Sequence, residues 1–322
     1  MNYISAAQAA EKWGVSERSV RNYCQQGRIT GSVRNENSWL IPENAEKPER
    51  KKRNGKIPSD LLSRLRLEKD SGFKGGIYHK IQIELTYNSN HIEGSRLTKD
   101  QTRYIFETNT IGISDGAVNV DDVIETANHF RCIDLVIDQA KYVLTESFIK
   151  QLHLILKNST SDSRKAWFAV GDYKRLENEV GGLQTVKPAD VQKKMKELLK
   201  DYNLSKKKSF DELLQFHYDF ERIHPFQDGN GRVGRLILFK ECLRNDITPF
   251  IIEDDIKMFY YRGLQEWKNE KGYLRDTCLS AQAPHLLVID LGSEQTVTAL
   301  EYLPRAEQGA PGSIKSYRIY IY

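Results

Sequence analysis

The chain is poor in cysteine and has no long apolar run. Its 322 residues include four cysteines, at positions 24, 132, 242 and 278, and no two of them form a CxxC pair. This spacing argues against a zinc site or a disulfide framework and suits a reducing compartment. No apolar stretch approaches the ~18 residues that a membrane span needs, and no signal-peptide pattern opens the sequence. The sequence therefore predicts a cytoplasmic protein that makes no membrane contact.

Composition predicts a folded chain whose basic charge is concentrated at one end. Hydrophobic residues make up 39% and charged residues 29% of the sequence, which is typical of globular proteins, and the length suits two or three domains. Residues 1–57 hold 11 Lys or Arg against 6 Asp or Glu, although the whole chain carries only +4. This excess is expected of an N-terminal module that meets a polyanion, but a solvated lysine-rich linker would produce the same excess.

Residues 1–45 form the first predicted domain. Residues 1–3 are predicted to run directly into a helix that starts at Ser5 with a capping box to Gln8 and ends at Gly14. A second helix is predicted from Ser16 to Gly27, followed by strand-like segments at 32–34 and 38–41. This order resembles the excisionase-like winged helix-turn-helix family. The resemblance implies DNA contacts by Arg18, Arg21 and Asn22 in the major groove and by Arg34 at a phosphate. A protein-binding or dimerising module of the same fold is the alternative.

The remainder of the chain divides into a linker, a helical domain and a strand-rich end. Residues 46–57 are polar and charged and are predicted to be a linker. Apolar spacings of three and four residues predict helices over 76–92, 98–109, 119–140, 145–157, 188–203, 209–223, 231–245 and 254–269. A Gly-Gly turn within 178–186 predicts a β-hairpin. Residues 283–322 read as short strands and resemble the opening part of a discoidin-type (F5/8 C) domain, to which we assign no activity.

The residues that carry chemistry lie in one segment, 224–235, which reads His-Pro-Phe-Gln-Asp-Gly-Asn-Gly-Arg-Val-Gly-Arg. Amphipathic helical stretches flank it, so its central turn ends at a helix N-terminus, where free N–H groups and the helix dipole attract anions. Arg232 and Arg235 share one face of the new helix and suit phosphate oxygens. Asp228 offers an oxygen ligand for Mg²⁺, and the His224 imidazole is suited to accepting a proton. These residue types predict a phosphoryl-transfer site.

This segment resembles the Fic family signature, His-x-Phe-x-Asp/Glu-Gly-Asn-Gly-Arg-x-x-Arg, at every fixed position, and the resemblance covers roughly residues 58–282. It implies a mainly α fold, a helical bundle with a β-hairpin flap, that transfers AMP from ATP to a Ser, Thr or Tyr hydroxyl of a target protein. His224 would be the general base, and Asp228 would bind Mg²⁺. The nucleotide phosphates would be bound by Gly229, Asn230, Gly231, Arg232 and Arg235, with the Asn230 side chain on the α-phosphate.

The same resemblance assigns roles to three other parts of the domain. The predicted hairpin corresponds to the flap that holds the target segment as an added strand, through Val180, Gly181, Gly182 and Leu183. Tyr260 and Tyr261 match aromatic positions that border the adenine, although core packing explains them equally well. Family members that phosphorylate their targets carry Lys at the position of Gly231, so Gly231 favours AMP transfer.

Ser89, Glu93 and Gly94 match the family's inhibitory motif, Ser/Thr-x-x-x-Glu-Gly/Asn, placed N-terminal to the catalytic core as in class II members. Ser89 and Glu93 are four residues apart, so they share one face of a helix near 88–94 that Gly94 can end. The resemblance implies that Glu93 forms a bidentate ion pair with Arg235 and prevents productive ATP binding. In some family members this glutamate also helps to remove AMP.

The sequence thus predicts a nucleotidyltransferase that depends on ATP and Mg²⁺ and is autoinhibited by Glu93. One alternative is a DNA-binding transcriptional regulator whose Fic core senses nucleotide and transfers little, although a pure sensor would not need His224. Another is a different donor in the same site, such as UTP or a CDP-linked group. The target protein, any DNA sequence, formation of a homo-oligomer and the role of residues 283–322 are left open.

Overall fold

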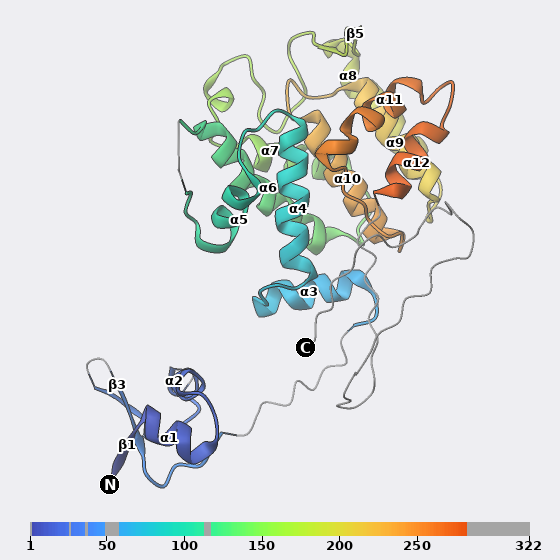
Figure 1. The fold of residues 1–322 in the computed structure, drawn as a ribbon. Helices are drawn as coiled ribbons and strands as arrows, with labels where there is room; N and C mark the ends of the chain where they lie inside the picture. Colours follow the sequence, from blue (N-terminus) through green and yellow to red (C-terminus); the bar gives the residue numbers. More distant parts are fainter. Residues whose placement is uncertain (1, 26, 36–37, 49–57, 113–116, 282–322) are drawn as a thin grey trace. The chain divides into compact units, whose positions relative to one another are not determined.

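The computed structural model describes residues 2–25, 27–35, 38–48, 58–112 and 117–281 (Figure 1). The chain divides into two compact units, Met1–Lys56 and Ile57–Tyr322. The segment 283–322, for which the discoidin-like strands are predicted, lies outside the described residues, as does most of the predicted linker.

The first unit packs two helices against a small antiparallel sheet. Its elements are β1 (Tyr3–Ser5), α1 (Ala6–Trp13), α2 (Glu17–Gln25), β2 (Val33–Asn35) and β3 (Ser38–Pro42), with the strands in the order β1-β3-β2. The predicted capping box is present, because the Ser5 hydroxyl accepts from the Gln8 N–H and the Gln8 side chain accepts from the Ser5 N–H. The buried core is built from both helices, the segment after α2, and β3: Ala6, Ala9, Ala10, Trp13, Val20, Cys24, Ile29 and Ile41.

Strand β1 differs from the sequence prediction, which took the first residues directly into a helix. Tyr3 pairs with Pro42 and Ser5 with Leu40 in antiparallel register. The partner strand is therefore nearly forty residues away, and three residues are too few to show a strand periodicity of their own. The wing prediction agrees with β2 and β3, in which Val33 pairs with Leu40 and Asn35 with Ser38.

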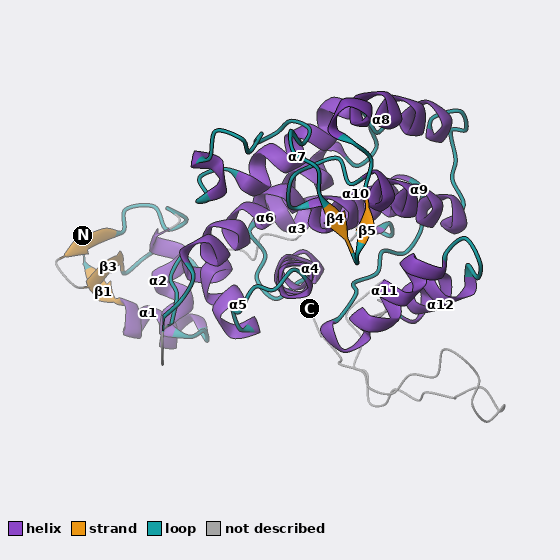
Figure 2. Cartoon of the chain, turned by 90° about the horizontal axis from the view of Figure 1, so that it is seen from above, coloured by secondary structure: helices purple, strands orange, loops and turns teal. Residues whose placement is uncertain are grey.

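The second unit is helical, and its strands within the described residues are confined to one short hairpin (Figure 2). Its helices are α3 (Leu61–Ser71), α4 (Ile77–Ile92), α5 (Lys99–Thr108), α6 (Val120–Gln139), α7 (Glu146–Lys157), α8 (Pro188–Tyr202), α9 (Phe210–Ile223), α10 (Asn230–Arg244), α11 (Lys257–Glu266) and α12 (Gly272–Ser280). Short 3-10 turns cover Asp162–Arg164 and Asp254–Ile256. None of the helices in the described ranges has the length and apolarity needed to cross a lipid bilayer.

Helix α10 is the centre of this unit. It contacts α9, α6, α4 and α7, and every residue from Val233 to Leu243 is buried. A helix that is buried on all sides has little amphipathic pattern, so its own sequence does not indicate which face points to which neighbour. Because α10 follows the motif loop directly, the loop is held against the most buried element of the unit.

Two helices were not predicted from the sequence, and their composition explains why. In α3 the face toward the core carries Arg64 and Glu68, which form a buried ion pair at 2.8 Å. These two charged residues interrupt the apolar spacing of three and four residues from which a helix is predicted. Helix α12 spans nine residues and begins at Gly272, so it offers few turns over which a period could be detected.

The predicted hairpin is present as β4 (Glu179–Val180) and β5 (Leu183–Gln184), paired antiparallel. Gly181 and Gly182 have φ of +56° and +75°. Two consecutive residues with positive φ are what a two-residue hairpin turn needs, and glycine adopts them without steric cost.

Candidate active site

The motif loop connects the end of α9 to the start of α10. His224 follows the last residue of α9 with φ +50° and ψ +63°, and its N–H donates to the Phe220 carbonyl at 2.9 Å. Gly229 has φ +80° and immediately precedes Asn230, the first residue of α10. The unpaired N–H groups of the first turn of α10 therefore lie in the loop that also carries His224.

The Asn230 side chain forms two hydrogen bonds within the motif loop. Its side-chain Oδ1 accepts from the Phe226 N–H at 2.8 Å, and its Nδ2 donates to the Phe226 carbonyl at 2.8 Å. The residue is 1% exposed. These two bonds use Oδ1 and one hydrogen of Nδ2, whereas the side-chain amide has two N–H donors. The expected contact of the Asn230 side chain with the α-phosphate stays a prediction.

The Phe226 ring is fully buried and stacks on His153 of α7, with centroids 4.0 Å apart and planes within 8°. The Nδ1 of His153 accepts from the Gly171 N–H at 3.0 Å, so the proton of this imidazole lies on Nε2. Nε2 in turn lies 3.2 Å from the Asp228 carbonyl. Burial lowers the pKa of His153 to about 3, in agreement with a neutral ring. His153 was not identified from the sequence.

His224 is half-buried and neutral at physiological pH. Burial, followed by the positive charge of Lys174, lowers its pKa to about 4. A neutral imidazole can accept a proton, whereas one already protonated cannot. The environment of His224 is therefore compatible with the predicted role of general base.

Asp228 belongs to a network of charged side chains that the sequence did not reveal. Its Oδ2 lies 2.7 Å from Lys157 Nζ and 3.1 Å from Arg232 NH2. Lys157 and Arg232 both also contact Glu125. Burial alone would raise the pKa of Asp228, but Arg232 and Lys157 hold it well below its usual range. The carboxylate is therefore ionised.

This network bears on whether Mg²⁺ fits the site. Asp228 offers a charged oxygen on a side chain that is 46% exposed, which suits a hard cation. Among the described residues, no group of three or more His, Cys, Asp or Glu side chains is arranged to hold a metal ion. Asp228 is therefore the residue of the motif loop that could hold a magnesium ion.

Arg235 is buried and held by α4. Its Nε donates to Ser89 Oγ at 3.0 Å, and its NH2 donates to the Ser89 carbonyl at 2.9 Å and to Glu93 Oε1 at 2.6 Å. The pair expected between Glu93 and Arg235 is therefore present, but it is made through one guanidinium nitrogen rather than two. Glu93 caps α4, and Gly94 follows it with φ +95°.

The Glu93 carboxylate also lies against the start of α10. A Cβ atom placed on Gly231 would collide with Glu93 Oε1. The carboxylate therefore occupies space beside the first turn of α10, where an anionic ligand would be attracted. Any larger residue at position 231 would have to displace Glu93.

Comparison with known proteins shows which family the motif loop and its neighbouring helices resemble. Residues 143–241 match the model of the Fic/DOC family. This part of the chain is similar to a Fic domain. The chain is 27% identical over 184 residues to a protein adenylyltransferase Fic of Nematostella vectensis and 28% identical over 211 residues to one of Drosophila virilis. These alignments cover 56% and 63% of this chain but 42% and 39% of those proteins, so the chain spans about two fifths of the curated relatives it matches.

Solved structures share the fold of this part of the chain. A Fic domain containing signaling protein from Bacteroides thetaiotaomicron superposes with a TM-score of 0.55 at 24% identity, covering 69% of this chain and 91% of that one. Fic-1 (residues 134–508) from C. elegans gives a TM-score of 0.54 at 18% identity, covering 69% and 68%. The predicted fold class, a mainly helical Fic bundle, is confirmed.

The two tyrosines expected near adenine have different surroundings. Tyr260 is 1% exposed, and its hydroxyl lies 2.6 Å from His217 Nε2 within a hydrophobic cluster. It therefore packs in the core of the second unit, which is the alternative that the sequence also offered, and its contact with adenine stays a prediction. Tyr261 is 41% exposed, and its hydroxyl donates to the Ile92 carbonyl at the end of α4 at 3.2 Å.

The flap presents strand edges. Val180 is 42% exposed, and β4 and β5 form a sheet of two strands. Each strand therefore has an outer edge whose backbone groups are not used in the hairpin. The hairpin has the form that the target-binding prediction requires, and its function stays a prediction.

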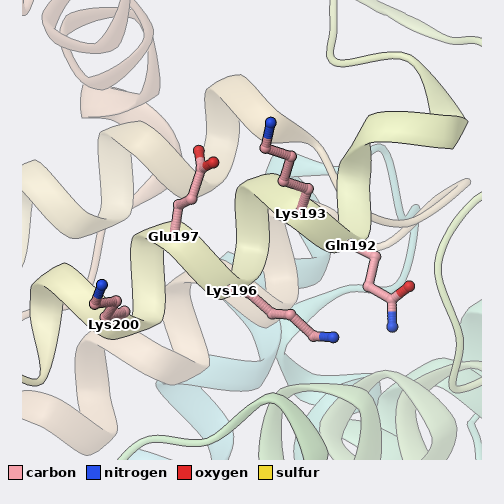
Figure 3. Close-up of a pocket in the computed structure, with 5 residues that line it drawn as sticks. All are labelled: Gln192, Lys193, Lys196, Glu197 and Lys200. Carbon is pink, nitrogen blue, oxygen red and sulfur yellow. The ribbon is translucent and has the colours of Figure 1, made fainter.

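A surface hollow on α8 is separate from this loop. Gln192, Lys193, Lys196, Glu197 and Lys200 line it (Figure 3). All five project from a single helix, and none belongs to the motif. Lys194 pairs with Glu197 at 2.9 Å, as is common on a solvent-facing helix. The candidate active site is therefore placed at the motif loop.

Proposed function

We propose that this Fic domain transfers AMP from ATP to a hydroxyl group of a target protein, and that Glu93 restrains it. The observation that carries the proposal is the loop itself, in which a neutral His224 precedes the N-terminus of α10 and the buried Arg235 follows it. The names of the similar proteins, which are protein adenylyltransferases, support the same reaction class.

In the proposed reaction, His224 takes the proton of a Ser, Thr or Tyr hydroxyl. The freed oxygen attacks the α-phosphorus of ATP, the bond from that phosphorus to the oxygen bridging to the β-phosphate breaks, and pyrophosphate leaves. The N–H groups at the start of α10 stabilise the charge that develops on the phosphate. Asp228 would hold a Mg²⁺ ion, which when bound neutralises phosphate charge.

Arg232 and Arg235 supply the positive charge for the β- and γ-phosphates in this proposal. Both are buried and paired with carboxylates, Arg232 with Glu125 and Asp228 and Arg235 with Glu93. Glu93 is the acidic partner that lies beside the first turn of α10, so it competes with the terminal phosphates of ATP. Release of Glu93 would make Arg235 available.

The reaction class is tested by measuring which phosphorus atom of ATP is transferred to protein. The full chain is incubated with MgATP labelled at either the α- or the γ-phosphorus, and label in protein is measured after denaturing electrophoresis. We expect protein to be labelled from the α position only. Label from the γ position would mean phosphorylation and would overturn the proposal. Parallel reactions with α-labelled UTP and CTP test the other nucleotide donors.

For the N-terminal unit we propose DNA binding. Arg18, Arg21 and Asn22 are exposed on α2, and Arg34 is exposed on β2. Arg21 also pairs with Glu17 at 2.5 Å on the helix surface, and a surface pair of this kind is weak enough to open when DNA binds. A protein-binding module with this fold remains the competing proposal.

Replacing Arg34 by alanine is expected to weaken binding of genomic DNA fragments by the full chain and to lower the salt slope of log K by about 0.9, because one phosphate contact is lost. The Asn22→Ala variant is a matched control that removes a proposed base contact without changing charge, so its salt slope should equal that of the wild type. Gel shifts at several salt concentrations measure both. If the wild-type chain shifts no fragment at low salt, DNA binding is excluded.

A further inference from the structure

The base of the flap is attached to the loop that carries His224 by a set of contacts centred on Lys174. Lys174 is 3% exposed and lies between α7 and β4 in sequence. Its Nζ donates to Asn178 Oδ1 at 2.7 Å and to Thr185 Oγ1 at 2.6 Å. These two acceptors flank the hairpin on either side, and Thr185 Oγ1 lies 2.9 Å from the Asn178 carbonyl. The ammonium of Lys174 thus closes the hairpin at its base.

The same segment is bonded to the motif loop immediately after His224. The Lys174 N–H donates to the Pro225 carbonyl at 2.9 Å. Asn178 Nδ2 donates to the Phe226 carbonyl at 3.1 Å, and the Leu176 N–H donates to Gln227 Oε1 at 3.1 Å. Three consecutive residues of the loop are therefore bonded to residues 174–178.

We propose that Lys174 is a positioning residue that fastens the flap to the catalytic loop, so that a target segment bound along the flap places its hydroxyl beside His224. This inference rests on the proposed function. Burying a charged ammonium group that has two neutral oxygens as its acceptors costs free energy of folding. Keeping a lysine at this position therefore calls for a role that its two hydrogen bonds provide. An apolar side chain could fill the same space at lower cost, but it could not donate to Asn178 and Thr185.

The charge of Lys174 has a second consequence for His224. Burial lowers the pKa of Lys174 itself to about 8, so the side chain is mostly charged at pH 7. Its charge adds to the effect of burial in lowering the pKa of His224, while Glu93 and Asp228 act in the opposite direction. Removing the positive charge should therefore raise the pKa of His224, and the loss of activity on acidification should begin at a higher pH.

The test compares Lys174→Met, Lys174→Arg and Thr185→Val, each in a Glu93→Gly chain, with the His224→Ala chain supplied in trans as the acceptor protein. Thr185→Val removes one end of the attachment and keeps the charge. AMP transfer is measured across pH with increasing acceptor, and ATP binding is measured by calorimetry.

We expect Lys174→Met to lower kcat/KM for the acceptor by about tenfold, because small misplacements of reacting groups are costly. The fall in the transfer rate at low pH, the acid limb of the pH profile, should also move to higher pH in this variant. Thr185→Val should lower kcat/KM without that shift, and Lys174→Arg should keep the acid limb of the parent. ATP affinity should stay within about twofold in all three variants.

Two results would overturn the proposal. One is unchanged kcat/KM and pH dependence in Lys174→Met. The other is loss of ATP binding together with transfer, because Lys174 would then support the whole loop rather than the position of the acceptor. Absence of AMP transfer in the Glu93→Gly parent would instead refute the proposed function, so the two failures are distinguishable.

Discussion

Replacing Glu93 by glycine is expected to raise the rate of AMP transfer by about 10- to 150-fold. Arg235 is 6% exposed and donates to Glu93 at 2.6 Å, and a hydrogen bond between charged groups is worth about 1.5–3 kcal/mol. A nucleotide that binds productively has to replace this contact, so its removal lowers the barrier by a similar amount. Incorporation of α-labelled AMP by the full chain, at equal concentrations of wild type and variant, measures the change.

Ser89→Ala provides the matched control for this prediction. Ser89 lies on the same helix and contacts the same arginine through its hydroxyl at 3.0 Å, but the contact involves no negative charge. Its loss should raise transfer less than the loss of Glu93. Equal rates in the wild type and Glu93→Gly would show that the ion pair between Glu93 and Arg235 does not limit the reaction. Inhibition by Glu93 would then be excluded.

The helical elements were largely predictable because their signals are local. Helix α9 begins after Ser209, which forms a capping box with Glu212, and its buried side chains recur at helical spacing. The hairpin was predictable because two adjacent glycines mark its turn. Strand β1 and helix α3 were missed because the first needs a distant partner and the second buries an ion pair.

The motif residues of the candidate site were predictable because they are contiguous, whereas their supports were not. Glu125, His153 and Lys157 come from α6 and α7, some 70 to 110 residues before their partners in the motif. On a helix, a buried lysine or histidine gives no local sign of the oxygen atom from another segment that faces it. The packing of α6 and α7 against α10 brings these side chains to the motif loop.

The roles of individual side chains were the least predictable part. Asn230 stands at a position where a phosphate contact is expected, but its amide bonds Phe226. Tyr260 and Tyr261 are neighbours in the sequence, but one is buried in the core and the other is partly exposed beside α4. Which face of α11 points inward is decided by its packing on α12 and by the contact with His217.

Replacing His224 by asparagine is expected to lower AMP transfer by about 10²–10⁴-fold, the usual contribution of a general base, and to leave ATP binding nearly unchanged. Asparagine is the appropriate substitution because His224 has φ +50°, and asparagine tolerates the left-handed region better than alanine does. The His224→Ala variant should lose transfer equally but melt at a lower temperature. Thermal melting and calorimetric ATP titration therefore separate a chemical loss from a folding loss.

The pH dependence provides an independent check on the same residue. A base must be unprotonated to act, and the pKa of His224 is lowered to about 4. Transfer in the Glu93→Gly chain should therefore persist when the pH falls from 7 to 5 and should decline only as the pH approaches 4. A decline centred near 6.5 would mean that His224 is as solvated as an ordinary histidine. In that case neither the burial of the imidazole nor the charge of Lys174 would influence the reaction. Separately, retention of transfer in His224→Asn would exclude His224 as the general base.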